Sequence, residues 1–279
     1  MVCMHLFFLR ETKDKIMIPK MKTPISYYGG KQNMLDIILP LLPAHKVYVE
    51  PFFGGGAVFW GKEPVRAEII NDKNGMVVNF YEQIKTNFEE LKMKIDATPY
   101  SRNVYRKAMV IYEYPYLFSP LIRAWAFWVC TIQGFSNQIG SWRATQPRCK
   151  ESLLNHNKKE LFSKEMADRL SLVQIENMDA VYLIDRLDTS DTFFYVDPPY
   201  VGANQGHYGG YTQEHFELLL NCLSKIKGKF LLSSYPNESL SLYKEKYGWY
   251  MKMYDMALSA SNSKRKRKIE VLTANYIIT

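Results

Sequence analysis

The stretch VYVEPFFGGGAVFW, residues 47–60, decides the fold. It begins with a short apolar run at 47–50 that is typical of a buried strand, and it turns at Gly54–Gly56 into an apolar segment with helical character. A second strand candidate follows at 67–70, and a helical segment follows at 76–84. This order of strand, turn, helix, strand and helix indicates a doubly wound α/β sheet.

The strand pattern continues in the second half of the chain. We expect five further strands, at 172–175, 193–196, 229–233, 250–258 and 269–278. Helical segments at 179–187 and 212–226 separate the first three of them, whereas only a short polar and basic segment separates the last two. The predicted fold class is therefore α/β, with a doubly wound, mostly parallel seven-stranded sheet that ends in an antiparallel hairpin.

The middle of the chain, residues 86–170, has a different character. It is rich in Arg, Lys, Tyr and Trp, and it contains helical runs at 121–132 and 158–170. Between these runs, a polar segment at 134–150 carries two glycines and a proline, which predict a loop or hairpin. We interpret the whole middle part as a helical insertion into the sheet domain.

This interpretation divides the chain into three parts. The sheet domain comprises 24–85 and 171–279, and the insertion comprises 86–170. Residues 1–23 are expected to be a loosely attached N-terminal extension, because the organised pattern begins near Pro24, before a helical run at 33–42.

The net charge favours an anionic partner. The 279 residues include 36 Lys and Arg against 28 Asp and Glu, which gives a net charge of +8 and favours a polyanion such as nucleic acid. Aromatic residues make up 14% of the chain, which suits a protein that stacks nucleobases as well as one with an aromatic core.

Cysteine and histidine usage indicates neither a disulfide framework nor a metal site. The four cysteines are scattered without a C-x-x-C pair, and the five histidines lack metal-ligand spacing. The apolar run Leu6–Leu9 lacks the other features of a signal peptide, and no segment approaches the roughly 20 apolar residues of a membrane span. We expect a metal-free cytoplasmic protein.

The glycine turn after the first strand predicts a ligand site. Glycines let a ligand approach the backbone closely, at the edge where open α/β sheets bind ligands. The next strand ends at Asp72, whose carboxylate can accept hydrogen bonds from a ribose. Phe59 occupies the third glycine position of a G-x-G-x-x-G fingerprint, and no Lys-Ser/Thr pair follows the turn as in a P-loop, so an adenosine ligand without a pyrophosphate fits better. A purely structural turn is the alternative.

The sharpest chemical signal is Asp197-Pro198-Pro199-Tyr200, directly after the strand at 193–196. An aromatic amine such as adenine N6 is a poor nucleophile, because its lone pair is delocalised into the ring. The Asp197 carboxylate and the Pro198 carbonyl could each accept one amino hydrogen and aim the lone pair at a sulfonium methyl group, while Tyr200 stacks on the base. The alternative is a turn in which the prolines merely end the strand.

Together, these motifs resemble the Dam-type (D12 class) N6-adenine DNA methyltransferase family. Four stretches occur in the family's order, namely YYGGK at 27–31, EPFFGGG at 50–56, IND at 70–72 and DPPY at 197–200. Weaker matches are TQEH at 212–215 and KRKIEV at 266–271, so the resemblance spans 24–279. It implies a Rossmann-like methyltransferase fold, S-adenosyl-L-methionine as cofactor, double-stranded DNA as substrate and a bacterial or phage origin.

The resemblance also implies roles for individual residues. Tyr27 and Lys31 would line the cofactor pocket, and Asp72 would hold the ribose. The methionine portion of the cofactor would be surrounded by Pro51, Phe52, Gly54 and Gly56. Asp197 would lie beside both the cofactor and the target amine, and Asp179 near the cofactor's adenine. Lys31 could instead be a solvated charge, and Asp179 a helix N-cap.

The resemblance makes 86–170 the target-recognition domain. Residues 134–143 depart from the family's Gly-Arg-x-Asn type pattern, so the target sequence is not predicted. Arg143 and Arg148 are candidates for base or phosphate contacts, with ordinary surface charges as the alternative.

Two loops near the expected site are further candidates for contacts with DNA. The basic run Lys264, Arg265, Lys266, Arg267 and Lys268 could grip phosphates at the crevice, although such a run is often just a solvated loop. The loop at 206–211 could close over an extruded base, or it could be an ordinary connection.

We therefore expect a site-specific DNA adenine methyltransferase that flips its target base and transfers the methyl group directly, without a covalent enzyme intermediate. An N4-cytosine methyltransferase would use the same amine chemistry, and a catalytically silent DNA-binding protein of this fold is the alternative of another class. A dehydrogenase is disfavoured by the incomplete phosphate fingerprint. We expect a monomer, with a restriction endonuclease for the same site as a possible partner.

Overall fold

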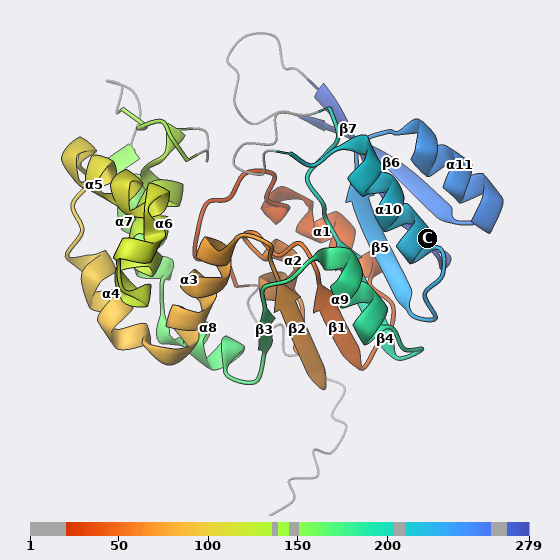
Figure 1. Cartoon of the computed structure of the whole chain (residues 1–279), viewed down its shortest axis with the longest axis horizontal. Coiled ribbons are helices and arrows are strands. Elements are labelled where there is room, and N and C mark those ends of the chain that lie inside the picture. Colours follow the sequence, from red (N-terminus) through yellow and green to blue (C-terminus); the bar gives the residue numbers. More distant parts are fainter. Residues whose placement is uncertain (1–20, 136–138, 145–150, 203–209, 258–266, 279) are drawn as a thin grey trace, which may run out of the picture.

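The computed structural model describes residues 21–135, 139–144, 151–202, 210–257 and 267–278 (Figure 1). Its centre is a seven-stranded sheet with the order β3-β2-β1-β4-β5-β7-β6. The strands are β1 (Val47–Glu50), β2 (Ala67–Asn71), β3 (Gln174–Glu176), β4 (Thr192–Val196), β5 (Lys229–Ser234), β6 (Tyr250–Ala257) and β7 (Arg267–Ala274). Strands β1 to β5 are parallel, and β7 runs antiparallel to both β5 and β6. The predicted mixed sheet and its terminal hairpin are confirmed.

The two faces of the sheet are covered by different helices. Tyr48, Phe193 and Tyr195 belong to a hydrophobic cluster with α1 (Leu35–Ile38), α2 (Ala57–Gly61) and α3 (Gly75–Thr86). Val49, Phe194 and Val196 belong to a second cluster with α9 (Ala180–Leu187), α10 (Gln213–Leu223) and α11 (Glu238–Tyr247). Neighbouring residues of one strand thus join opposite clusters, as strand geometry requires. Because both faces are covered, β4 is buried along its whole length.

Five helices follow α3 and lie together at one side of the sheet, beyond β3 (Figure 1). They are α4 (Phe88–Asp96), α5 (Arg102–Glu113), α6 (Pro120–Gln133), α7 (Glu151–Leu161) and α8 (Lys164–Leu170). The short 3-10 helix η3 (Pro115–Leu117) joins α5 to α6. We refer to these helices as the helical segment.

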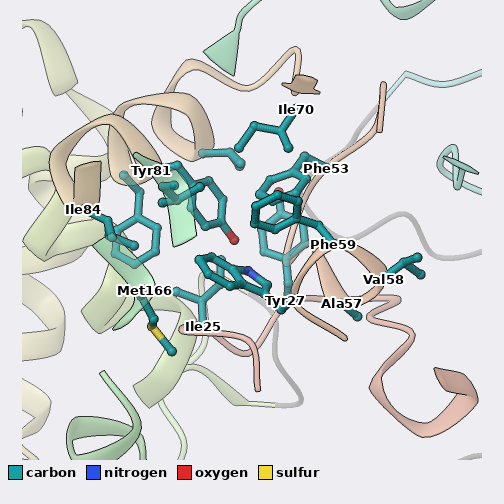
Figure 2. Packing of buried hydrophobic residues seen from close by; sticks show 14 of the residues in the cluster. Ile25, Tyr27, Phe53, Ala57, Val58, Phe59, Ile70, Tyr81, Ile84 and Met166 are labelled. Carbon is teal, nitrogen blue, oxygen red and sulfur yellow. The ribbon is translucent and has the colours of Figure 1, made fainter. Parts of the chain in front are cut away.

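The helical segment shares its core with the sheet. Phe80 on α3 packs against Phe127 of α6 and Phe162, with ring centres 5.7 and 6.2 Å apart. Figure 2 shows part of this cluster, in which Tyr81 and Ile84 of α3 lie together with Phe53 of the glycine turn and Met166 of α8. The helical segment and the first face of the sheet therefore form one continuous hydrophobic cluster.

An ion-pair cluster ties α8 to β2. The Glu68 carboxylate on β2 accepts hydrogen bonds from Lys62 and from both terminal nitrogens of Arg169 on α8. The Arg169 guanidinium also lies 3.8 Å from the centre of the Phe59 ring, directly after the glycine turn. A planar guanidinium can bind both carboxylate oxygens with parallel hydrogen bonds while its face packs on a ring, whereas a lysine ammonium binds as a point charge.

Several element boundaries differ from those expected. The helical run predicted at 158–170 is two helices, because the chain breaks at Phe162 to bury that ring against Phe80 and Phe88. The strand predicted at 172–175 begins at Gln174, and Leu172 is 95% exposed. The run predicted as a helix at 33–42 is a single helical turn flanked by the 3-10 helices η1 (Gln32–Met34) and η2 (Leu39–Leu41). The last strand ends at Ala274.

No helix within the described ranges combines the length and apolar content that a membrane span requires.

Candidate active site

The candidate site lies at the carboxyl edge of the parallel strands, where β1 and β4 are neighbours. From β1 the chain continues to β2 and β3 on one side, and from β4 it continues to β5 on the other. Such a topological switch point is where open α/β sheets bind ligands, because the loops leave the sheet in opposite directions. The segments that follow β1, β2, β3 and β4 meet there.

The glycine turn after β1 is held rigidly. Gly54 and Gly56 have positive φ angles of 47° and 65°, and a Cβ atom on Gly56 would lie 2.3 Å from Cζ of Phe53. The Gly54 amide donates to Asp72, and the Tyr81 hydroxyl donates to the Gly54 carbonyl at 3.0 Å. Only glycine fits at position 56, for reasons of both backbone conformation and space.

Asp72 anchors this turn to the end of β2. Its buried carboxylate accepts hydrogen bonds from the Gly54 and Asn74 amides, each at 2.8 Å. Burial raises the pKa of Asp72 to about 6, and these two amide bonds limit the rise. Next to it, the Asn71 side chain donates to the Pro51 and Met178 carbonyls and so ties the ends of β1, β2 and β3 together.

A cavity of about 440 Å³ opens beside these strand ends. Among the residues predicted for the site, Pro51, Phe52, Asp72, Asp179 and Pro199 line it. Its apolar walls include Met178 and Val181, and the Tyr211 ring meets the Phe52 ring edge-on at 6.2 Å. Asp179 also caps α9, accepting from the Val181 and Tyr182 amides, so the N-cap interpretation of this residue is confirmed.

The other predicted cofactor residues lie around the cavity without lining it. Tyr27 is buried and packs on Phe127. Lys31 is also buried, so the interpretation of Lys31 as a solvated charge is wrong. Its ammonium lies 2.8 Å from Oδ1 of Asp197, donates to the Gly29 carbonyl at 3.0 Å and sits 4.9 Å from the centre of the Tyr200 ring. The segment before β1 thus reaches the turn after β4.

The turn at Asp197 is compact and almost enclosed. The Asp197 side chain is 18% exposed, and burial raises its pKa while the Lys31 ammonium opposes the rise. The Tyr200 hydroxyl contacts the same Oδ1 at 3.2 Å, and the Tyr200 ring meets Tyr235 edge-on at 4.4 Å. The prolines at 198 and 199 lead out of β4 toward the cavity, which Pro199 lines.

Two buried acids at the site were not among the predicted site residues. Glu50 ends β1 and accepts from the Tyr48 hydroxyl at 2.7 Å; burial raises its pKa to about 8, opposed by this hydrogen bond and assisted by the nearby Asp197 charge. Glu270 on β7 accepts from the Tyr200 hydroxyl at 2.7 Å and is wholly buried. The signal that could have found Glu270 is its position in the last strand, two residues before the buried Leu272.

The residues predicted to contact DNA are described only in part. Arg143 follows a short antiparallel bridge between Gly134 and Trp142, and its Nε donates to the Gly134 carbonyl at 3.1 Å. Lys268 forms an ion pair with Glu270. The other predicted contacts lie outside the described residues, namely Arg148, Lys264, Arg265, Lys266 and the side chain of Arg267. Of the loop at 206–211, only Gly210 and Tyr211 are described.

Among the described residues, no group of three or more His, Cys, Asp or Glu side chains is arranged to hold a metal ion.

Comparison with known proteins gives one family match and several related proteins. Residues 27–258 match the model of the D12 class N6 adenine-specific DNA methyltransferase family. A Type II methyltransferase, M1.LlaDCHI of Lactococcus lactis subsp. cremoris, is 26% identical over 280 residues, which cover 89% of this chain and 93% of that protein. The DNA N-6-adenine-methyltransferase of Escherichia phage P1 is 34% identical over 84 residues, 29% of this chain and 11% of that protein. Among solved structures, a precorrin-6y C5,15-methyltransferase of Geobacter metallireducens covers 90% of this chain, and 93% of its own chain is covered, with a TM-score of 0.41 and 10% identity.

Proposed function

The chain belongs to the D12 class N6 adenine-specific DNA methyltransferase family, and from this premise we propose that it transfers a methyl group from S-adenosyl-L-methionine to N6 of a flipped adenine in double-stranded DNA, with Asp197 as the central catalytic residue. The observation that carries the proposal is the position of Asp197 at the end of β4, two residues before Pro199, which lines the cavity. A cofactor in the cavity and a base above the turn would meet at this point.

The cavity suits S-adenosylmethionine in size and in chemistry. A volume of about 440 Å³ lies within the usual range for small-molecule sites. Phe52, Met178 and Val181 offer apolar walls for an adenine ring, and the acidic Asp72 and Asp179 suit ribose hydroxyls or a cationic ligand. The bound cofactor would supply an electrophilic methyl group on a positively charged sulfur.

The residues of the turn act on the base. The Asp197 carboxylate and the Pro198 carbonyl each accept one hydrogen of the adenine amine, which draws the nitrogen lone pair out of conjugation. As N6 gains the methyl group it must lose one proton, and the Asp197 carboxylate is positioned to receive it. Burial favours this step, because it raises the pKa of Asp197 above that of a solvent-exposed Asp. Tyr200 provides the aromatic surface beside the base.

Lys31 sets the charge state of Asp197. Its ammonium contacts Oδ1, the oxygen that also meets Tyr200, so Oδ2 is the oxygen we assign to the substrate amine. The ammonium favours the ionised carboxylate, and only the ionised form has both oxygens free of hydrogen. Without a neighbouring cation, the pKa of the buried Asp197 would rise further, which favours the protonated form, and that form cannot take up the amine proton.

Contacts with DNA are assigned to the helical segment and the terminal hairpin. Arg143 directly follows the antiparallel bridge between Gly134 and Trp142, after α6, and we propose that its side chain enters a groove. The basic residues Lys264, Arg265, Lys266 and Arg267 would add phosphate contacts, and Arg148 belongs to the same proposal. We further propose that the protein acts in the cytoplasm as a monomer and has a restriction endonuclease for the same site as its partner.

Methylation of defined DNA by the purified protein tests the proposal. Duplex DNA is incubated with S-adenosylmethionine carrying a labelled methyl group, digested to nucleosides and separated by mass. We expect label in N6-methyladenine. Label in N4-methylcytosine would support the alternative amine chemistry, and unlabelled DNA combined with no calorimetric binding of S-adenosylmethionine would identify a silent DNA-binding protein.

A further inference from the structure

The Tyr200 hydroxyl is surrounded by three oxygen atoms. Oε2 of Glu270 lies 2.7 Å away, Oγ of Ser233 lies 2.8 Å away, and Oδ1 of Asp197 lies 3.2 Å away. A tyrosine hydroxyl has one hydrogen to donate. Glu270 and Asp197 are both acceptors, and the contact to Glu270 is shorter by 0.5 Å, so we assign the hydrogen to Glu270 and let the Ser233 hydroxyl donate to Tyr200.

Glu270 is held in place by a cation of its own. Its other oxygen, Oε1, lies 2.5 Å from the Lys268 ammonium, whose side chain is 29% exposed against 1% for Glu270. Residues 268 and 270 are two apart on β7 and so point to the same face of the sheet. That face carries Tyr48 and Tyr195, which belong to the hydrophobic cluster beneath the catalytic turn.

Two ion pairs therefore meet at one hydroxyl. Asp197 of the pair with Lys31 and Glu270 of the pair with Lys268 both contact the Tyr200 hydroxyl. Lys268 and Glu270 belong to β7, whereas Tyr200 follows β4. The hydrogen bond between Tyr200 and Glu270 therefore connects the terminal hairpin to the catalytic turn.

We infer that Glu270 is a positioning residue for methyl transfer: it fixes the Tyr200 hydroxyl, and through it the turn at Asp197, while Lys268 acts on the reaction through Glu270 and not as a phosphate contact. This inference rests on the proposed role of the turn at 197–200. It changes the interpretation of Lys268, which the sequence predicted as part of a phosphate-binding run.

The first test is the rate of a single turnover with Glu270→Gln. The amide keeps the shape of the side chain but removes the charge that orders the hydrogen bonds, so we expect methyl transfer to slow about tenfold or more, with DNA and cofactor affinities unchanged. Glu245→Gln on the outside of α11 removes the same charge at an exposed position and should match the wild type. A folded Glu270→Gln protein that reacts within threefold of the wild-type rate overturns the inference.

A double-mutant cycle shows whether Glu270 acts through Tyr200. If it does, Glu270→Gln should slow the Tyr200→Phe protein hardly at all, because the hydroxyl that it orients is already missing. Two effects that multiply in the double variant would show that Glu270 acts by another route. If the proposed function is wrong, the wild type itself transfers no methyl group. If only this inference is wrong, the wild type methylates adenine and the two effects still multiply in the double variant.

Lys268→Met supplies a second test that does not alter the buried acid. A positioning role predicts a slower single turnover, again about tenfold, and an unchanged dependence of DNA affinity on salt. A phosphate contact predicts an unchanged turnover rate and a salt slope reduced by about one, and that result would overturn the inference. Lys246→Met on α11 is the matched control, because Lys246 is exposed and belongs to neither ion pair.

Discussion

The Lys31 ammonium lies 2.8 Å from the Asp197 carboxylate, although the two residues belong to opposite ends of the catalytic motifs in the sequence. Lys31 precedes β1 and Asp197 follows β4, so this ion pair joins the segment before β1 to the turn after β4 at the topological switch point. Both side chains are largely buried, and their charges therefore interact more strongly than an exposed pair would.

Replacing Lys31 should move the acidic limb of the pH–rate profile. Asp197 must be ionised to take up the amine proton, so activity falls as the pH drops through the pKa of Asp197. In Lys31→Met the cation that opposes the effect of burial is lost, and the pKa of Asp197 rises further. We expect the acidic limb to shift to higher pH and the rate at neutral pH to fall about tenfold.

The other groups that face Asp197 stay in place in this experiment. They include Glu270, Tyr200 and Glu50, so the shift can be assigned to the lost cation. Lys46→Met, which removes an exposed lysine at the opposite edge of the sheet, should leave the profile unchanged. An acidic limb that stays where it is in Lys31→Met, or moves to lower pH, contradicts the role given to Lys31.

Glu50 should destabilise the protein at alkaline pH. The pKa of Glu50 is about 8 in the folded protein, against 4.5 for an ordinary Glu. Between these values the folded state binds more protons than the unfolded state. The contribution of Glu50 to the free energy of unfolding is therefore fully present below pH 4.5 and is lost as the pH rises from there through 8. Glu50→Gln removes this loss, because the amide stays neutral.

Urea unfolding at pH 5 and pH 9 measures the effect. We expect Glu50→Gln to match the wild type within about 1 kcal/mol at pH 5 and to exceed it by roughly 3 kcal/mol at pH 9. The exposed Glu245→Gln should show no such difference between the two pH values. A Glu50→Gln protein that is less stable than the wild type at pH 9 would show that Glu50 is stabilised as a charged group.

The glycine turn offers a test of packing. Gly56→Ala combines a left-handed backbone with a Cβ atom only 2.3 Å from the Phe53 ring. Gly248, at the C-cap of α11, has a similar φ of 67° but open space around its Cα. We expect Gly248→Ala to lower the free energy of unfolding by about 1 kcal/mol and Gly56→Ala by at least about 3 kcal/mol in urea titrations. Equal losses would mean that the Phe53 ring moves aside freely.

Much of this fold follows from local sequence patterns. β1 has the predicted bounds because Val47–Glu50 is a buried apolar run that ends abruptly at Pro51 and the glycine turn. β4 was recognisable for the same reason, with Asp197 and two prolines marking its end. That the segments after β1, β2 and β4 surround one site was implied by the resemblance of their motifs to the methyltransferase family.

The remaining features depend on contacts that distant residues make. The helices α4, α5 and α11 were not predicted individually, and the break at Phe162 arises because α3 offers a site for its ring. The partner of Glu270 is Tyr200, 70 residues earlier in the chain, and only the assembled sheet brings the two together. Lys31 was predicted to line the cofactor pocket, and its contact with Asp197 requires knowledge of how the segment before β1 folds back.

The most direct measurement of the central claim is a single turnover of methyl transfer by Asp197→Ala, with DNA affinity and thermal unfolding measured on the same protein. We expect the rate to fall about a thousandfold or more, while DNA affinity stays within about threefold and the protein remains folded. Asp185→Ala, an exposed position on α9, serves as the control and should react at the wild-type rate. An Asp197→Ala protein that still methylates adenine within tenfold of the wild-type rate would contradict the assignment of Asp197 as the catalytic residue.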